Sequence, residues 1–195
     1  MITINNILTN KYKKLMLKYT IMDSSQSMIS SEAVKNHELH DKWVLWAHLP
    51  HDTDWSLTSY IKLTELSNME QVISLYNCVP ALMIRNCMLF LMRKGINPTW
   101  EDPKNANGGC FSFKVNNKNV PRVWTDLSYV LTGETVSNNP KFQSNITGIT
   151  ISPKKSFCIL KIWMHDLEYQ KPRNITDKEG LTVTGCIFKK HKPSY

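Results

Sequence analysis

Hydrophobic residues along this chain mostly alternate with polar ones or form short runs between turn-forming residues. Alternation of this kind is typical of half-buried strands, and short apolar runs are typical of strands buried on both faces. The segments at 88–93 and 110–115 flank a long loop that ends in Gly108-Gly109, so we expect these two strands to pair as a hairpin. Strands are predicted over 43–49, 60–66, 88–93, 110–115, 146–151, 157–164 and 181–188.

Helical spacing is found in only two segments. Ser67-Asn68-Met69-Glu70 has the form of a capping box, and apolar residues then recur at helical spacing up to Pro80. The second helix is predicted to begin near Pro121, to carry one apolar face that includes Trp124, and to end at Gly133. Seven strands with short connections and two helices predict an α+β fold, in which helices pack on one face of an antiparallel sheet.

Composition is consistent with one folded domain in a reducing compartment. The chain has 195 residues with 42% apolar content, and its five cysteines are scattered without a C-x-x-C pair, so we expect buried thiols. Residues 1–36 carry lysines and a polar serine cluster without sustained periodicity, which predicts a flexible tail before a domain at 37–195. No apolar stretch is long enough for a membrane span, and the net charge of +8 favours polyanionic partners.

Two tryptophans stand in polar loops, where burial in a core is unfavourable. Trp55 lies in the loop 51–55, and Trp100 lies beside Glu101 in the Pro- and Asn-containing loop 97–104. Two loop indoles and one carboxylate can clasp a flat cationic ring that carries N–H donors on its edge. The alternative interpretation is that the indoles are half-buried packing residues and Glu101 is a solvated surface acid.

These residues belong to a wider pattern that is similar to a known family. The chain resembles the messenger-RNA cap-binding proteins of the translation initiation factor 4E family, in one order from residue 37 to 165. The matching segments are His40-x-x-Trp43-x-Leu45-Trp46, Trp55, Leu75-Tyr76-Asn77, Gly95-Ile96-x-Pro98-x-Trp100-Glu101-Asp102, Asn105-x-x-Gly108-Gly109 and Ile162-Trp163. The resemblance implies a curved antiparallel sheet of seven to eight strands, backed by two or three helices on its convex face, with the cap on the concave side.

The resemblance also implies roles for four residues. Trp55 and Trp100 would sandwich the N7-methylated guanine of the cap, Glu101 would accept hydrogen bonds from its edge, and Trp163 would lie near the methyl group. The implied partners are capped mRNA and a scaffold protein of the initiation complex, and the implied location is the cytoplasm, as a monomer. No cofactor, metal or catalytic residue is expected.

The phosphate-binding side departs from the family pattern. Cys110 stands where the family has an arginine, and Ile159 stands where it has a lysine. Lys154 and Lys155 remain as candidate phosphate-binding residues, although they could equally form a solvated turn after Pro153. We therefore expect an affinity that depends more on stacking, and on the nucleotide after the cap.

The scaffold-binding side departs as well. Ile73 stands where the family carries a tryptophan in its first helix, so we expect a different or co-adapted scaffold, unless Ile73 is simply helix core. The segment after Trp163 is short and broken by Pro172, which together with the residue composition suggests a divergent member of the family, such as a viral one. The candidate scaffold-binding residues are His37, Met69, Ile73, Thr125, Asp126 and Gly133.

Other functional classes leave different signatures. Glycine-rich cofactor loops, a P-loop and acidic two-metal clusters are absent from the sequence, which argues against an enzyme. A general single-stranded RNA-binding protein, and a cap-binding decoy that represses translation because it recruits no scaffold, remain as alternatives. We expect the histidines at 37, 40, 48 and 51 to lie on the surface or at a sheet edge rather than to bind metal.

Overall fold

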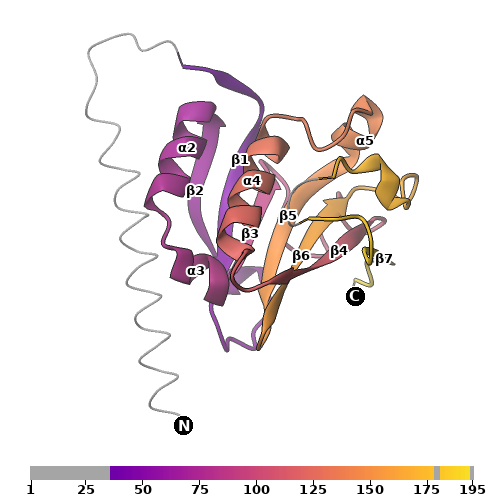
Figure 1. Cartoon of the computed structure of the whole chain (residues 1–195). Helices are drawn as coiled ribbons and strands as arrows, with labels where there is room; N and C mark the ends of the chain where they lie inside the picture. The colour runs from indigo at the N-terminus through magenta and orange to yellow at the C-terminus, as the bar shows by residue number, and fades with distance from the viewer. Residues whose placement is uncertain (1–35, 178–180, 194–195) are drawn as a thin grey trace.

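A computed structural model describes residues 36–177 and 181–193, and Figure 1 shows the whole chain. The predicted tail at 1–36 therefore lies outside the described residues, apart from Asn36. None of the described helices has the length and apolar composition needed to span a bilayer.

The described strands form one seven-stranded sheet in the order β2-β1-β3-β5-β6-β4-β7, and every neighbouring pair is antiparallel. Register shifts interrupt the β1–β2 and β5–β6 ladders, and irregularities of this kind increase twist and curve a sheet. The strands are β1 (Glu38–His48), β2 (Tyr60–Asn68), β3 (Met88–Arg93), β4 (Gly109–Asn116), β5 (Ile146–Pro153), β6 (Phe157–Met164) and β7 (Ile187–Lys190). The prediction of a mainly antiparallel α+β fold is thus confirmed.

Two of the predictions about strands are wrong. The strands β3 and β4 do not form a hairpin, because β3 pairs with β1 and β5 whereas β4 pairs with β6 and β7. The last strand was expected over 181–188 but covers only Ile187–Lys190. Leu181 is buried in an irregular segment, so its apolar character reflects core packing rather than a place in a long strand.

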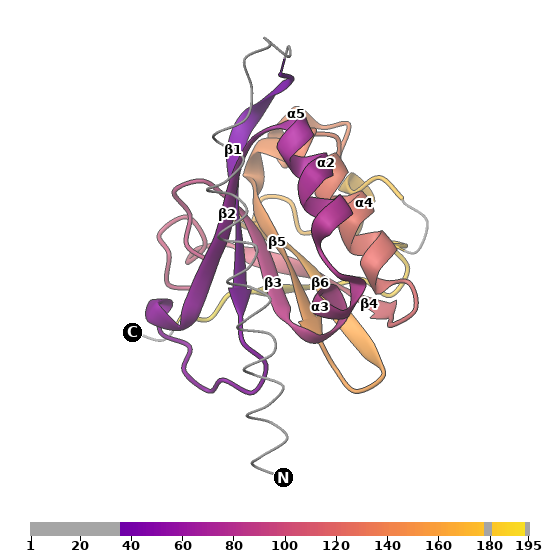
Figure 2. The same cartoon turned by 90° about the vertical axis from the view of Figure 1, so that its left-hand side faces the viewer.

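Helices cover one face of the sheet (Figures 1 and 2). The predicted helices correspond to α2 (Met69–Cys78) and α4 (Val120–Thr132), which lie side by side. The cap of α2 is Asn68, whose side chain accepts a hydrogen bond from the Gln71 backbone N–H. Sequence periodicity missed α3 (Ala81–Asn86) and α5 (Pro140–Asn145) because six residues are too few to show it. Short 3-10 helices occur at η1 (Leu57–Ser59) and η2 (Pro172–Asn174).

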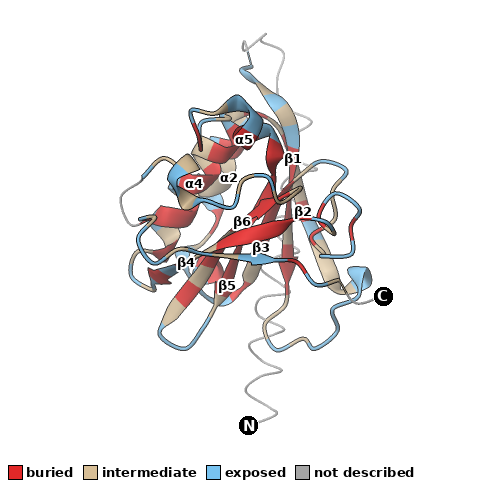
Figure 3. Cartoon of the chain, turned by 90° about the vertical axis from the view of Figure 1, so that its right-hand side faces the viewer, coloured by how far each residue is buried: buried red, intermediate tan, exposed pale blue. Residues whose placement is uncertain are grey.

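Alternation along the strands divides the apolar side chains between two faces. On β4, Phe111, Phe113 and Val115 join the main core under the helices, whereas Cys110 faces the opposite side. On that opposite, concave face a smaller buried cluster contains Phe90, Met92, Cys110 and Trp163. Figure 3 shows the buried central strands and the exposed loops around them. This buried cluster forms the base of the concave face, to which the loops that carry Trp55 and Trp100 are adjacent.

Candidate functional site

A continuous series of aromatic rings crosses the concave face and joins the two loop tryptophans; we call it the aromatic arc. Trp55 forms one end, Trp100 forms the other, and Trp163 lies between them on β6. The centroid distances of successive pairs are 4.3 Å for Trp55–His48, 5.2 Å for His48–Tyr60, 5.2 Å for Tyr60–Phe90, 6.4 Å for Phe90–Trp163, 4.9 Å for Trp163–His191 and 5.6 Å for His191–Trp100. The two loop indoles therefore lie on the same side of the sheet.

Trp55 is held by its own loop and by the end of β1. The indole lies flat on the buried imidazole of His48, whose Nε2 is 2.7 Å from the Asp54 carbonyl oxygen. The Asp54 carboxylate accepts hydrogen bonds from the backbone N–H and the hydroxyl of Ser56, and these bonds lower the pKa of Asp54. One indole face is covered in this way, yet 55% of the Trp55 residue stays exposed and available for a ligand.

The Trp100 loop is fixed by two buried polar side chains. The carboxylate of Asp102 accepts hydrogen bonds from the backbone N–H groups of Asn97 and Lys104, at 2.8 and 2.9 Å. Asn105 donates to the carbonyl oxygens of Asn97 and Thr99, at 3.0 and 2.9 Å. These bonds fix the backbone of the loop from inside, and Trp100 remains 37% exposed at its surface.

Steric crowding explains why glycine occupies positions 108 and 109, directly after this loop. A Cβ on Gly108 would collide with the Met164 carbonyl, and a Cβ on Gly109 would lie 2.6 Å from the carbonyl oxygen of Lys189. Only glycine lets the chain enter β4 this close to both neighbouring strands.

The charge of Glu101 acts on the other end of the arc. Burial, with a smaller contribution from the negative charge of Glu101, raises the pKa of Tyr60 to about 12. Tyr60 in turn contacts His48, the platform of Trp55. The Glu101 side chain is exposed, and its negative charge acts on Tyr60 within the arc.

The middle of the arc holds two polar ring atoms without a hydrogen-bond partner among the described residues. These are Nε1 of Trp163, a donor, and Nε2 of His191. His191 Nδ1 is 2.7 Å from the Asn105 carbonyl oxygen, so this nitrogen carries the proton and Nε2 is the acceptor in the neutral ring. Burial, assisted by the charge of Lys161, lowers the pKa of His191 and keeps the ring neutral.

Two lysines outside the predicted phosphate-binding pair lie near Cys110 on the sheet. Lys189 on β7 is the direct cross-strand partner of Cys110. Lys161 on β6 precedes Trp163, the other partner of Cys110, by two residues. Both lysines therefore lie on the same face of the sheet as Cys110. Their positive charges act on the Cys110 thiol, whose pKa burial nevertheless raises. The Lys161 ammonium also lies 5.8 Å from the centre of the Trp100 ring. Two cations therefore lie on the same face as Cys110.

The predicted phosphate-binding residues lie elsewhere. Lys154 and Lys155 are exposed at the β5–β6 turn, where they line one hollow together with Trp55. They are therefore close to the Trp55 end of the site, whereas Lys161 and Lys189 are close to Trp100 and Cys110.

The candidate scaffold-binding residues lie on or beside the helices of the convex face. His37 precedes β1, its ring nitrogen is 2.6 Å from Glu70, and its carbonyl accepts a hydrogen bond from the Met69 backbone N–H. A Cβ on Gly133 would contact the Met69 side chain, so the ends of α2 and α4 meet there. Thr125 and Asp126 follow along α4. Ile73 is 46% exposed on α2, which excludes the interpretation of this residue as helix core.

The structure corrects two expectations about cysteine and histidine. His48 is buried rather than on the surface, because alternation along β1 places it next to the concave floor. Three cysteines are buried as expected, whereas Cys78 is exposed at the end of α2 and Cys186 is partly buried.

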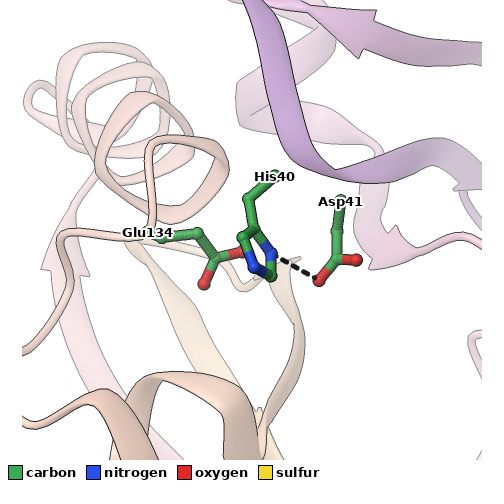
Figure 4. Close-up of side chains that lie close together, drawn as sticks. All are labelled: His40, Asp41 and Glu134. Atoms are coloured by element: carbon green, nitrogen blue, oxygen red, sulfur yellow. Dashed lines mark ion pairs between the residues drawn. The ribbon is translucent and has the colours of Figure 1, made fainter.

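A cluster of His40, Asp41 and Glu134 has a geometry that could hold a metal ion (Figure 4). The guanidinium of Arg93, however, forms ion pairs with both Asp41 and Glu134 and stacks on Trp43. Because Arg93 already pairs with both carboxylates, this cluster is a structural ion-pair network that ties β1 and β3 to the end of α4.

The protein is thus a cupped antiparallel α+β domain, with helices on its convex side and an aromatic arc with an adjacent carboxylate on its concave side. The chain belongs to the eukaryotic initiation factor 4E family, whose model matches residues 38–192. It is 30% identical over 165 residues to translation initiation factor 4E-2 of Schizosaccharomyces pombe, covering 80% of this chain and 62% of that protein. The chain thus spans less than two thirds of the length of this relative.

Other relatives extend the comparison. A homologue from Acanthamoeba polyphaga mimivirus is 42% identical over 62 residues, which cover 32% of this chain and 23% of that protein. Schistosome initiation factor 4E complexed with m7GpppA and a 4E-binding protein superposes with a TM-score of 0.61 at 26% identity, over 68% of this chain and 74% of that one. The Ascaris suum protein with m7G cap superposes at 0.60 with 23% identity, over 69% and 77% of the two chains.

Proposed function

We propose that this protein binds the 7-methylguanosine cap of mRNA and acts in translation initiation. The observation that supports this proposal is the aromatic arc, which begins at Trp55, ends at Trp100 and has Trp163 in its middle. Structures of the schistosome and Ascaris relatives contain cap ligands, which is consistent with the same role.

Methylation at N7 gives the guanine ring a positive charge, and this charge is the basis of selectivity. Stacking between Trp55 and Trp100 contributes a cation–π attraction of about 2 kcal/mol once water is excluded. Glu101 accepts hydrogen bonds from N1–H and the exocyclic amine, a bidentate contact worth about 1–3 kcal/mol of base discrimination. Trp163 lies against the methyl group. Unmethylated guanosine loses the first contribution and keeps only part of the rest.

The triphosphate of the cap contacts lysines of the concave face and of the β5–β6 turn. Lys154 and Lys155 keep the role expected from the sequence, and the ammonium groups of Lys161 and Lys189 supply charge beside Cys110, where the family arginine is missing. Flexible lysines give a weaker and less directional phosphate contact than a guanidinium. The base contacts therefore carry a larger share of the affinity.

On the convex face, a scaffold helix would lie across α2 and α4. The schistosome relative is complexed with a 4E-binding protein, and the exposed Ile73 offers an apolar anchor of smaller size than an indole. The presence of Ile73 in place of the family tryptophan supports a second candidate function, a cap-binding decoy that recruits no standard scaffold. Both functions are those of a cytoplasmic binding protein rather than an enzyme.

The test is retention on immobilised 7-methylguanosine triphosphate and elution by the free analogue, followed by titration with methylated and unmethylated GTP. We expect strong preference for the methylated form, and loss of that preference in Trp100→Ala and Glu101→Gln. Equal affinity for both nucleotides would instead identify a general single-stranded RNA-binding protein. A translation assay after depletion and add-back separates an initiation factor from a decoy.

A further inference from the structure

A hollow of about 630 Å³ lies beside the Trp55 end of the aromatic arc. Its walls come from three segments that are far apart in the sequence: the β1–β2 loop, the helix α3 and the β5–β6 turn. These three segments lie together at one end of the sheet in Figure 1. Trp55 and His48 line this hollow as well as forming the arc, so the two sites share a wall.

The rim of the hollow is basic. Arg85, Lys154 and Lys155 line it, and none of their side chains forms an ion pair among the described residues. Asp52 is the opposing acid on the rim, and its carboxylate accepts a hydrogen bond from the Asp54 backbone N–H. Three cations against one acid favour an anionic ligand.

The same hollow has an apolar wall. Leu82 of α3 is 47% exposed there, and Met88 and Pro50 also line it. An apolar wall, an exposed indole and a basic rim are the components with which proteins bind single-stranded nucleic acid, since each base has a flat face and each phosphate a charge. The volume is also in the range of pockets that enclose a group of nucleotide size.

We propose that this hollow binds the first nucleotides of the mRNA that follow the cap. This inference rests on the proposed cap-binding function, because the shared wall at Trp55 places the hollow where RNA leaving the clamp would pass. Arg85 contacts the phosphodiester groups and a base packs against Leu82, while Lys154 and Lys155, which hold the triphosphate, adjoin them on the same rim. RNA is favoured over an acidic peptide because the capped end is held next to the hollow and is thereby at high local concentration.

The experiment compares 7-methylguanosine triphosphate, a capped dinucleotide and a capped oligoribonucleotide, each titrated over a range of salt concentrations. The wild-type protein should bind the longer ligands more tightly and with a steeper dependence on salt. In Arg85→Ala the affinity for 7-methylguanosine triphosphate should stay unchanged. The increase in affinity from 7-methylguanosine triphosphate to the capped oligoribonucleotide, called the gain below, should fall. The slope of log affinity against log salt should decrease by about 0.7 for each phosphate group that the variant no longer neutralises.

Two further variants make the result specific. Leu82→Glu adds negative charge to an exposed position of the wall and should reduce the gain more strongly than Arg85→Ala. Lys141→Ala removes one exposed cation from α5, away from the hollow, and should leave both the gain and the salt slope unchanged. Thermal unfolding of each variant confirms that the fold is retained.

The outcomes separate this inference from the proposed function. If the wild-type protein does not distinguish methylated from unmethylated nucleotide, the cap-binding proposal itself fails. If it binds the cap but gains nothing from added nucleotides, or if Arg85→Ala and Leu82→Glu keep the full gain, the hollow does not bind RNA. An equal loss in Lys141→Ala would show a nonspecific charge effect and would overturn the inference as well.

Discussion

The imidazole of His48 lies parallel to the indole of Trp55, with 4.3 Å between ring centroids and 3° between planes. His48 is buried at the end of β1, and its Nε2 is tied to the Asp54 carbonyl oxygen, so it cannot move easily. A loop tryptophan on a rigid platform is partly fixed before any ligand arrives. Fixing a side chain in advance reduces the entropy that binding would otherwise cost.

Replacing His48 by alanine should therefore weaken cap binding, although His48 acts through Trp55 and does not itself contact the cap. Loss of the stacked ring, worth about 1 kcal/mol, should lower affinity roughly fivefold. His48→Phe keeps an aromatic platform and should retain most of the affinity. Tryptophan fluorescence titration with 7-methylguanosine triphosphate measures both. Equal affinity of the alanine variant and the wild type would show that the platform has no role in binding.

Asp102 should be essential for the shape of the Trp100 loop. Its buried carboxylate satisfies the backbone N–H groups of Asn97 and Lys104, which Asp102→Ala would leave without partners. A buried group without a partner costs about 1–3 kcal/mol and a partly buried one less, so we expect lower stability together with weaker cap binding. Urea denaturation and cap titration measure the two effects. Asp52→Ala removes an aspartate from the other loop as a control for stability and should cost much less.

Lys161 should contribute to binding of the triphosphate and not to binding of the base. Its ammonium lies near Trp100 and Cys110, on the face that has no family arginine. In Lys161→Ala, affinity for 7-methylguanosine triphosphate should fall and its salt dependence should become weaker, whereas affinity for the nucleoside without phosphates should change little. The ratio of the two affinities is the measurement. Parallel losses for both ligands would assign Lys161 to base binding or to packing.

Stability should fall in mild acid because of His191. Burial lowers the pKa of this histidine below its value of about 6.5 in unfolded chains, so the unfolded state binds the proton more readily. The stabilising contribution is complete above pH 6.5 and is lost as pH falls from there toward the lower folded pKa. Thermal unfolding midpoints between about pH 5 and 7 should show this decrease, and His191→Phe should show a smaller one. An identical decrease in the variant would assign the effect to other groups.

Most of the sheet could be predicted because the relevant signal is local. Alternation of apolar residues identified six strands, including 88–93 and 157–164, which match β3 and β6. The order of the strands could not be predicted in this way, since pairing depends on contacts between distant segments. The β5–β6 hairpin lies between β3 and β4, which is why the expected hairpin across the Trp100 loop does not form.

The site shows the same division. The loop tryptophans and Glu101 were visible as unusual residues in polar loops, and Lys161 could have been found from its spacing of two to Trp163 on one strand. His48 could have been found likewise from its spacing to Trp46 on β1. His191 could not, because its place in the aromatic arc depends on β7 joining the edge of β4.

The convex face offers a test of partner choice at Ile73. This residue is 46% exposed on α2, so a larger side chain fits there without disturbing the core. Ile73→Trp restores the indole found in the family and should raise affinity for standard scaffold peptides by about tenfold or more, as expected for an interface hot spot. Ile73→Ala is the matched control and should weaken whatever binding the wild type shows. Peptide titration by calorimetry measures all three proteins. If the wild type already binds standard peptides as tightly as Ile73→Trp, the absence of the indole has not altered partner choice, and the idea of a divergent scaffold is wrong.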